Sequence, residues 1–581
     1  MKLMIQTLTN LSKKHKFELL SLLIIFLSLA LTLPKLNSIP DGFQWDEAAS
    51  GYNSYSLLKT GKDEWGVSWP LFIKSFGDYK SAFLSYVIMP FFVLGGVNQA
   101  MARMPTVILA AAGALGLIIF IKNKSTKNLA LLTGLILVTN PWFLHYARIA
   151  FEPMPSLGLM LLGFGFWTSQ RHRVKIFGSL LLVMSMYVYH STRLFLPLIM
   201  IMYLVIFNQH KIKAQLKKNL IPWLIILIGT SLIWQGILFS DSGDRAKQVF
   251  FWNTTELTTV VEEGIYRNRI LNYPMVRIYN NKGWFIINQL SRNYALHFSP
   301  NFLFPFNNLT PAFSFGRQGN FYLILIPFLL IGIFAKKDRN KIYWFFLSWL
   351  LISPIPSSLT NSITNANRSL IMLPALCFFA AKGILISLEW LQKHIKIKHI
   401  QLLSNSSFIL IFLLYLGWYI HDWLAYFPEL SEPYWHGFYK EAAKDVYGQR
   451  HNYSTIYFTN TDTQPYIFFA WYNSIDPKIV QANTYNRDME HLVGIRELEN
   501  IQFTAVKKDT LPCFLLEENV LAVASPVDDF DFDEDEIKAS KIYYHKNRFH
   551  PEKVALWVYD SNKLTEEEKE IAHVICEKHK K

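Results

Sequence analysis

Eleven apolar runs dominate the sequence, and each is about as long as a helix that crosses a bilayer. They cover residues 17–34, 104–121, 128–144, 153–169, 176–191, 194–208, 219–239, 320–335, 342–356, 369–390 and 403–422. A transmembrane helix needs about 20 predominantly apolar residues. The 581 residues are also 51% hydrophobic and 15% aromatic, which is too apolar for a soluble enzyme of this length. We therefore expect a mainly α, polytopic membrane protein with about 11 transmembrane helices.

Basic clusters between these runs predict the orientation. They read KKHK (13–16), KNKSTK (122–127), RHRVK (171–175), KIKAQLKK (211–218), KKDRNK (336–341) and KHIKIK (393–398). All six fall on one side if the runs cross in turn, and the positive-inside rule makes that side cytoplasmic. The net charge of +14 then belongs to cytoplasmic loops, so we expect no nucleic-acid partner. The first run has no cleavage site after it, and we interpret it as a retained helix in the plasma membrane with a cytoplasmic N-terminus.

Residues 81–97 form a further apolar run that disturbs this alternation. If they crossed the membrane, KNKSTK and the later basic clusters would lie outside. We therefore interpret 81–97 as a helix on or dipping into the outer surface, interrupted at Pro90 and at Gly95-Gly96. An ordinary span is the alternative.

The predicted topology leaves several segments outside together. They are 35–103, the turns near 145–152 and 190–193, the long loop 240–318, and all residues from about 423. We expect a transmembrane domain over 1–422 and a small extracytoplasmic α/β domain over 423–581, because STIYFTN, KIVQAN and KVALWVYD resemble strands. We interpret the long loop as a lid or acceptor platform. Cys513 and Cys576 can pair if the C-terminal part is outside.

Ionisable residues are concentrated in these outer segments. They are Asp46, Glu47, Asp78, Lys80 and Arg103 in the first segment, Arg148 and Glu152 in the next turn, His190 and Arg193 in the following turn, and Lys282 in the long loop. Charges at membrane boundaries are costly, so a cluster of them is a functional hypothesis. A few carboxylates beside several cations suit a base that works next to an anionic ligand such as a phosphate.

Each of these residues also has a purely structural interpretation. Acids favour the first turn of a helix, which would account for Asp46 and Glu47. Arg103 would serve as an interfacial anchor, and Arg148 and Glu152 are spaced to pair with each other. His190 suits an interface position. No set of histidines and acids has metal-ligand spacing, so we expect no metal site, and the acidic run 528–536 lacks the glycine of a calcium loop.

The order of the motifs carries a resemblance. An outer DE (46–47) is followed by TGKDEWG, by YK (79–80), by an apolar stretch ending in Gly-Gly, by ARMPT (102–106) and by NPWFLHYARIAFEP (140–153). This order resembles the GT-C superfamily of glycosyltransferases that depend on a phospholipid carrier, in particular the protein O-mannosyltransferase and aminoarabinose transferase group. The resemblance covers roughly residues 15–375. Bacterial members read DE, Tyr-x-Lys-Pro-Pro and Ala-Arg-Leu-Pro-Ser, whereas Ser81 and Ala82 follow Lys80 here.

The resemblance implies roles for individual residues. Asp46 matches the catalytic acid, and Glu47 matches its neighbour, which shapes the donor or acceptor site. Lys80 matches the phosphate-binding lysine, and Arg103 the arginine of the Ala-Arg-Leu-Pro-Ser segment. The remaining matches, taken as donor-binding, are Arg148, Glu152 (commonly Asp in the family) and Arg193, with Asp78, His190 and Lys282 as further candidates.

The implied activity is transfer of a monosaccharide from a polyprenyl-phosphate sugar donor to an extracytoplasmic hydroxyl, with inversion and with Asp46 as the base. It requires no cofactor, and the acceptor is a protein, a lipid or a cell-wall glycan. The alternatives are a transporter or flippase for a lipid-linked glycan, a ligase or polymerase that uses a diphosphate carrier, and a scaffold without catalytic activity.

Overall fold

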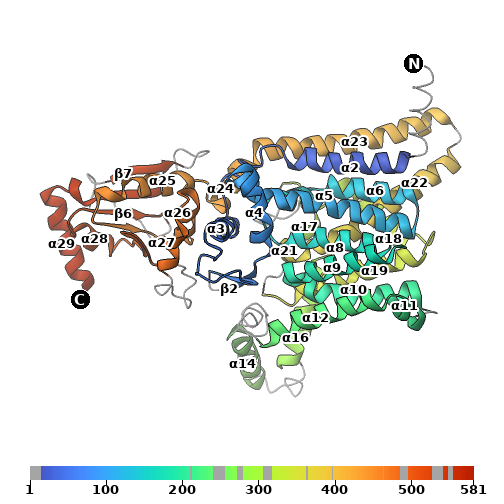
Figure 1. Ribbon diagram of the computed structural model, residues 1–581, viewed down its shortest axis with the longest axis horizontal. Coiled ribbons are helices and arrows are strands. Elements are labelled where there is room, and N and C mark those ends of the chain that lie inside the picture. Colours follow the sequence, from blue (N-terminus) through green and yellow to red (C-terminus); the bar gives the residue numbers. More distant parts are fainter. Residues whose placement is uncertain are drawn as a thin grey trace. The chain divides into compact units, whose positions relative to one another are not determined.

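The computed structural model describes most of the chain in two compact units (Figure 1). The described residues are 15–76, 78–209, 212–239, 255–270, 279, 281–304, 317–361, 364–395, 397–461, 463–483, 495–526, 541–546 and 554–580. The first unit comprises Met1–Pro34 with Pro105–Trp423, and the second comprises Lys35–Met104 with Leu424–Lys581. The predicted acidic loop at 528–536 lies outside the described residues.

The first unit is built from helices. Their bounds are α2 (Lys16–Thr32), α5 (Gln99–Lys124, from Pro105 on), α6 (Lys127–Val138), α7 (Pro141–Ala147), α8 (Pro153–Trp167), α9 (His172–Val188), α10 (His190–Asn208), α11 (Ile212–Lys218), α12 (Leu220–Phe239), α14 (Thr255–Ile270), α16 (Lys282–Leu296), α17 (Pro300–Leu303), η3 (Leu323–Leu325), α18 (Ile326–Phe334), α19 (Lys341–Ile352), α20 (Ile355–Ser358), α21 (Ala366–Ser369), η4 (Leu370–Met372), α22 (Leu373–His394) and α23 (Lys398–Ala425). Helix α8 packs on α9, α9 packs on α12, α2 packs on α6 and α18 packs on α22. The predicted long loop therefore contains helices α14, α16 and α17.

Length and composition qualify only some of these helices as membrane spans. Within the described residues, α5, α10, the stretch Ala366–His394 and the stretch Gln401–Ala425 are long and apolar enough, and two bent pairs raise the number from four to six. The pairs are α6 with α7, bent by 62°, and α11 with α12, bent by 89°. The mainly helical fold with several long apolar helices is thus confirmed, and the count of about 11 spans stays a prediction.

The bend between α6 and α7 follows from the dipeptide Asn140-Pro141. The Asn140 side chain accepts hydrogen bonds from the N–H groups of Trp142 and Phe143 and so caps α7. Pro141 suits the first position of a helix but disfavours a helical residue before it. The single predicted run 128–144 is therefore two helices.

Glycines allow α5 and α8 to approach each other closely. A Cβ atom on Gly158 would lie 2.3 Å from the carbonyl oxygen of Leu109, and one on Gly116 would lie 2.3 Å from the Cα of Leu162. Small residues at such crossings let two backbones make van der Waals contact, which is a main source of helix association in membranes.

The second unit begins with the predicted outer segment. It contains α3 (Trp45–Thr60), the antiparallel strands β1 (Phe72–Ser75) and β2 (Asp78–Ser81), and α4 (Phe83–Gly95), followed by the first residues of α5. Helix α3 ends at Gly61, whose φ of +68° suits glycine and whose N–H donates to Leu57.

Helix α4 corresponds to the apolar run 81–97. Its 13 residues extend about 20 Å at 1.5 Å per residue, which is shorter than the hydrocarbon core of about 30 Å. Tyr52 before α4 donates to the carbonyl oxygen of Ile475, and Gln99 after it donates to the Tyr472 hydroxyl. Because residues on both sides of α4 contact one short stretch of chain, these contacts support the interpretation of a surface helix.

One detail of that interpretation is wrong: the helix is not interrupted at Pro90. It continues through Pro90 and ends at Gly95, with Gly96 at a φ of +77°. Proline removes only one backbone hydrogen bond and already has a helical φ, so an apolar helix can accommodate it.

The C-terminal part of the second unit contains a mixed sheet. Its described strands are β3 (Thr455–Phe458), β4 (Glu497–Leu498), β5 (Ile501–Phe503), β6 (Val520–Ala524), β7 (Lys541–Lys546) and β8 (Val554–Asp560), in the order β4-β5-β3-β6-β8-β7. Strand β3 is parallel to β5 and β6, and the other pairs are antiparallel. The helical elements are α24 (Phe427–Trp435), α25 (Tyr439–Gln449), η5 (Arg450–Asn452), α26 (Pro465–Tyr472), α27 (Pro477–Ala482), α28 (Leu511–Leu515), η7 (Ser561–Lys563) and α29 (Glu566–Lys580).

Two of the three predicted strands are confirmed. STIYFTN contains β3 and KVALWVYD contains β8, but KIVQAN forms helix α27 instead. The side chain of Asp476 accepts a hydrogen bond from the N–H of Lys478, and Pro477 occupies the first helical position. These two residues start a helix, which outweighs the strand preference of the β-branched residues that follow.

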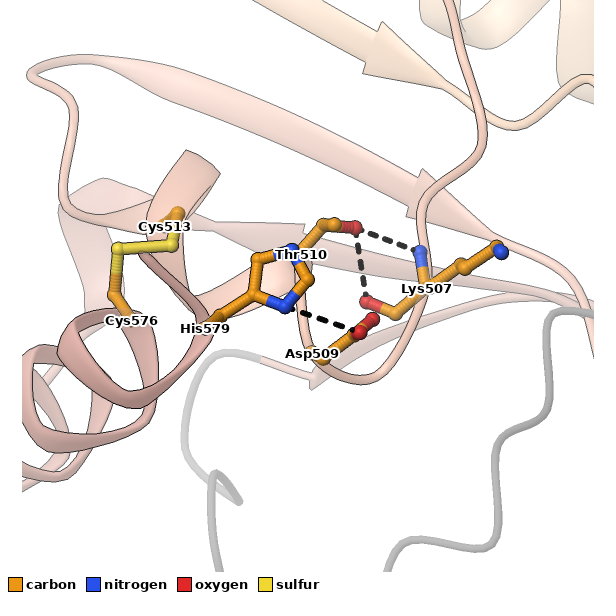
Figure 2. Close-up of a disulfide and its surroundings, with 6 residues drawn as sticks. All are labelled: Lys507, Asp509, Thr510, Cys513, Cys576 and His579. Atoms are coloured by element: carbon orange, nitrogen blue, oxygen red, sulfur yellow. Dashed lines mark hydrogen bonds and ion pairs between the residues drawn. A yellow bond between two sulfur atoms is a disulfide. The ribbon is translucent and has the colours of Figure 1, made fainter. Parts of the chain in front are cut away.

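A disulfide joins Cys513 on α28 to Cys576 on α29 across 63 residues of sequence (Figure 2). Helix α28 also packs on the buried strand β6, so the bond fixes the terminal helix to the sheet. Beside it, His579 lies 3.2 Å from the carboxylate of Asp509. This is the pairing that the sequence left open.

The predicted assignment of 1–422 and 423–581 to two domains stays a prediction. The compact units differ from it in one respect, because residues 35–104 belong to the same unit as residues 424–581. The predicted outer loop therefore folds with the C-terminal residues.

Candidate active site

The two adjacent acids of the DE motif lie in the first turn of α3. The side chain of Gln44 caps this helix by accepting the N–H of Asp46 at 2.7 Å. Successive helical residues point about 100° apart, and the two carboxylates accordingly have different surroundings. The Asp46 side chain is 33% exposed, whereas that of Glu47 is fully buried.

Asp46 forms an ion pair with Lys80. The Lys80 ammonium donates to Oδ1 of Asp46, and it lies 5.4 Å from the centroid of the Phe76 ring. Lys80 is in β2, opposite Ile73 in β1, so the hairpin fixes its backbone. Although Ser81 and Ala82 replace the two prolines of the family motif, the predicted lysine still reaches the predicted base.

Glu47 is held by two groups from distant parts of the chain. Arg103 donates to both carboxylate oxygens, from Nε at 2.9 Å and from Nη2 at 2.8 Å. Trp435 donates its indole N–H to Oε2 at 2.9 Å. A bidentate arginine and an indole orient a carboxylate strongly, so this geometry supports a positioning role for Glu47.

The guanidinium of Arg103 is fully buried, and all its donors have acceptors. Besides Glu47, Arg103 donates to the carbonyl oxygens of Leu36 at 3.0 Å, Pro40 at 3.5 Å and Gly42 at 3.0 Å. Together these five bonds use the five N–H groups of an arginine. Arg103 thus ties the segment before α3 to Glu47, and the predicted contact of Arg103 with the donor phosphate stays a prediction.

An aromatic pair lies next to the DE motif. The ring of His436 stacks on Trp45, with 5.3 Å between ring centroids. Burial lowers the pKa of His436 to about 4, so its imidazole is neutral at pH 7. His436 and Trp435 follow the last predicted span by more than ten residues, and no motif in the sequence pointed to either.

The GKDEWG motif forms a turn against α3. Asp63 accepts hydrogen bonds from the N–H groups of Trp65 and Val67, which closes the turn. The buried carboxylate of Glu64 accepts from Asn53 at 3.0 Å and from the hydroxyl of Tyr466 at 3.1 Å. Through Glu64, the motif therefore joins α3, which carries the two acids, to Tyr466 of α26.

Arg148 belongs to the first unit, where it caps a helix. It lies at the end of α7 and donates to the carbonyl oxygens of Leu31 at 3.3 Å, Thr32 at 2.5 Å and Pro34 at 2.5 Å. Its guanidinium carbon is 3.8 Å from the centroid of the Trp423 ring. A cation at the C-terminus of α2 satisfies carbonyl groups that the helix leaves unpaired.

Arg193 has a similar position in the first unit. Its guanidinium donates to the carbonyl oxygens of Met186 at 3.1 Å and Tyr187 at 3.5 Å, at the C-terminus of α9. His190 starts α10 and packs its ring on Tyr189, with 4.2 Å between centroids. Glu152 precedes α8, and the exposed Lys282 starts α16.

Of the predicted site residues, the structure thus brings together Asp46, Glu47, Lys80 and Arg103 in the second unit. Asp78 starts β2 in the same hairpin. Within the described part of the chain, no three His, Cys, Asp or Glu side chains are grouped so that they could hold a metal ion.

Comparison with solved structures identifies the fold. ArnT from Cupriavidus metallidurans, in the apo state and bound to undecaprenyl phosphate, aligns with a TM-score of 0.50 and 12% sequence identity over 93% of this chain and 97% of its own. An oligosaccharyltransferase from Archaeoglobus fulgidus aligns over 88% of this chain and 70% of its own, with a TM-score of 0.46 and 11% identity. No family model and no curated protein sequence matches the chain. The predicted resemblance to the GT-C glycosyltransferases is therefore confirmed at the level of the fold.

Proposed function

We propose that this protein is a membrane glycosyltransferase. It transfers a monosaccharide from a polyprenyl-phosphate sugar to a hydroxyl of an extracytoplasmic acceptor and inverts the anomeric carbon. The N-terminus would be cytoplasmic, and the second unit would lie outside. The undecaprenyl phosphate bound to ArnT supports a carrier of this kind, and the motif order supports the reaction.

The observation that carries the proposal is the half-exposed pair of Asp46 and Lys80. One carboxylate that solvent can reach lies beside one cation, while the neighbouring Glu47 is buried and fixed. A base must reach the proton that it removes, and a leaving phosphate needs a positive charge close by. Asp46 and Lys80 meet these two requirements.

In the proposed reaction, Asp46 accepts a proton and Lys80 stabilises the leaving group. The Asp46 carboxylate takes the proton of the acceptor hydroxyl, and the oxygen attacks the anomeric carbon from the face opposite the phosphate. The bond from that carbon to the phosphate oxygen breaks, and its electron pair leaves with polyprenyl phosphate. Lys80 stabilises the charge that develops there. Because the donor phosphate competes with Asp46 for Lys80, donor binding also releases the carboxylate to act as a base.

The experiment uses the full-length protein in nanodiscs. Polyprenyl-phosphate mannose, glucose and aminoarabinose, each radiolabelled in the sugar, are supplied with a membrane and cell-wall extract as acceptor. We expect label transfer and release of polyprenyl phosphate with one of these sugars. Asp46→Asn should lower turnover by about 10²–10⁴-fold, the usual contribution of a general base, while donor binding is retained.

Asp445→Asn on α25 is the matched control, because Asp445 is an exposed acid of the same unit. It should transfer sugar like the unmodified protein. Near-normal turnover of Asp46→Asn would contradict the role of the base. Competition by a diphosphate-linked oligosaccharide, but by no monophosphate sugar, would favour the ligase or polymerase alternative, and donor movement without transfer would favour a flippase.

A further inference from the structure

A second cluster of charges lies in the first unit, far along the sequence from the DE motif. Residues at the end of α5, at the start of α9 and at the α11–α12 bend line a pocket of about 240 Å³. We name it the lysine pocket, because Lys124, Lys175 and Lys218 line it. Each lysine comes from a different one of the basic clusters that the sequence assigns to the cytoplasmic side.

The lysine pocket carries positive charge without compensation. In the part of the chain that the structure describes, its lining includes no carboxylate, and none of the three lysines lies within ion-pair distance of one. Lys175 donates to the side-chain oxygen of Asn219 at 2.9 Å, which is a neutral partner. Bringing like charges together in a partly enclosed space is costly unless an anion joins them.

Aromatic rings hold one of the ammonium groups in place. The Nζ atom of Lys124 lies 5.2 Å from the ring centroid of Tyr203 and 4.6 Å from that of Phe207. Trp167 and Trp223 complete the apolar wall of the pocket. Lys124 and Lys175 are half-buried residues, so their side chains have fewer accessible rotamers than those of lysines on an open surface.

The size of the pocket restricts what it can bind. Sites for whole small molecules usually measure about 300–1,000 Å³, and 240 Å³ is below that range. A sugar nucleotide is therefore too large, whereas a single phosphate group with its oxygens fits. The first turn of α9 adjoins the pocket with His172, and helix N-termini favour anions in addition.

The bend at Asn219 relates the pocket to the bilayer. Helix α12 is apolar along its length, and α11 leaves it at 89°. If α12 crosses the membrane, the lysine-rich α11 runs along the membrane surface, as basic interfacial helices do. Leu220 and Ile221, just after the bend, are 53% and 52% exposed. Exposed apolar side chains that directly follow Asn219, a lining residue of the pocket, suit the acyl chains of a lipid.

We infer that the lysine pocket binds the phosphate headgroup of an anionic membrane lipid, on the membrane side to which the sequence assigns the basic clusters. Lys124 and Lys175 bind the phosphate oxygens, and Lys218 closes the pocket from α11. Basic pockets between membrane helices on the cytoplasmic side bind lipid headgroups in this way.

The test measures binding to the full-length protein in a neutral detergent by calorimetry. The probes are dihexanoyl phosphatidic acid, inorganic phosphate and dihexanoylglycerol, which separate the phosphate from the acyl chains. We expect phosphatidic acid to bind at least about tenfold more tightly than either of the other two. The double variant Lys124→Gln/Lys175→Gln should weaken its binding by about tenfold or more.

The matched control is Arg173→Gln/Lys213→Gln, which removes two exposed charges from the same basic clusters outside the pocket lining. It should leave binding within about twofold of the unmodified protein, because charges outside the pocket contribute little at moderate salt. An equal loss in this control, or unchanged binding in Lys124→Gln/Lys175→Gln, would overturn the site. Equal affinity for inorganic phosphate would overturn its assignment to a lipid. If the double variant does not fold, Lys218→Gln, an exposed position, should give a smaller loss in the same direction.

Discussion

Glu47→Gln and Asp46→Asn each remove one negative charge from adjacent residues of α3, and their effects on stability should differ widely. Glu47 is fully buried between Arg103 and Trp435, whereas Asp46 is 33% exposed and pairs only with Lys80 among the described residues. In Glu47→Gln, the buried guanidinium of Arg103 keeps its charge but loses its counter-charge. In Asp46→Asn, water can solvate the Lys80 ammonium instead.

The magnitudes follow from burial. Removing one partner of a buried ion pair costs about 3–5 kcal/mol, whereas an exposed pair contributes about 0–1 kcal/mol. For a unit of this size, about 1 kcal/mol corresponds to roughly 2–4 °C in the unfolding temperature, so Glu47→Gln should lower it by roughly 6–20 °C. Asp46→Asn should change it by less than about 4 °C.

The assay is thermal unfolding in detergent, followed by tryptophan fluorescence and by limited proteolysis of the C-terminal residues. The single variant Arg103→Gln and the double variant Glu47→Gln/Arg103→Gln complete a double-mutant cycle, and we expect a coupling of roughly 0.5–3 kcal/mol. The double variant should not regain the unfolding temperature of the unmodified protein, because Arg103 also donates hydrogen bonds to the carbonyl oxygens of Leu36 and Gly42. Equal shifts for Glu47→Gln and Asp46→Asn would refute the reasoning from burial.

Three further changes test the second unit. Gly42→Ala should cost at least about 1 kcal/mol in thermal unfolding, because Gly42 has a φ of +97° and its Cβ would lie 2.3 Å from the carbonyl oxygen of Trp435; the control Gly448→Ala, in open space on α25, should be neutral or stabilising. Cys513→Ser/Cys576→Ser should cost about 2–4 kcal/mol, and a reductant should destabilise the unmodified protein equally but leave the variant unchanged. His436 has a folded-state pKa of about 4 against about 6.5 unfolded, so the unfolded state binds more protons between these values and stability falls as the pH falls. The backbone of His436 is left-handed, with a φ of +52°, which asparagine tolerates. His436→Asn should therefore remove up to about 1.4 kcal/mol per pH unit from that slope; an unchanged slope would contradict the assignment.

The helices of the first unit follow closely from the apolar runs. A segment in lipid must be continuously apolar and must satisfy its own backbone hydrogen bonds, so the runs mark helices without any alignment. The bends are harder to predict. Asn140-Pro141 is a readable break, and Pro222 in the first turn of α12 signals a helix start just after the 89° bend at Asn219, but neither proline gives the angle of its bend.

In the second unit, two sequence predictions were wrong because neighbouring residues determine the local structure. The strand-like run KIVQAN predicted a strand, but the preceding Asp476-Pro477 is a helix start that competes with it. Pro90 predicted a break, yet α4 continues through it. In both places the neighbouring residues determine the structure, since Asp476-Pro477 starts α27 and the apolar residues around Pro90 keep α4 helical.

The candidate site, too, could be predicted from the sequence only in part. The order of the motifs predicted Asp46, Glu47, Lys80 and Arg103 as site residues. In the structure these four residues lie together in the second unit. The contacts from Trp435 and His436 join positions nearly 400 residues apart, and no spacing rule applies over that distance. The sequence also could not distinguish an arginine that binds a ligand from one that caps a helix, as Arg148 does, because both need the same guanidinium.

The second unit is made of two segments that are far apart in the sequence, and this restricts how many times the chain can cross the bilayer between them. The second unit includes both Lys35–Met104 and Leu424–Lys581, and we expect a folded unit to lie on one side of the membrane. The residues between these segments must therefore return to the side from which they left, which requires an even number of crossings. The ten predicted spans from 104–121 to 403–422 satisfy this parity. The unit also contains the Cys513–Cys576 disulfide, and such bonds persist in oxidising compartments, so we expect this side to be the outer one.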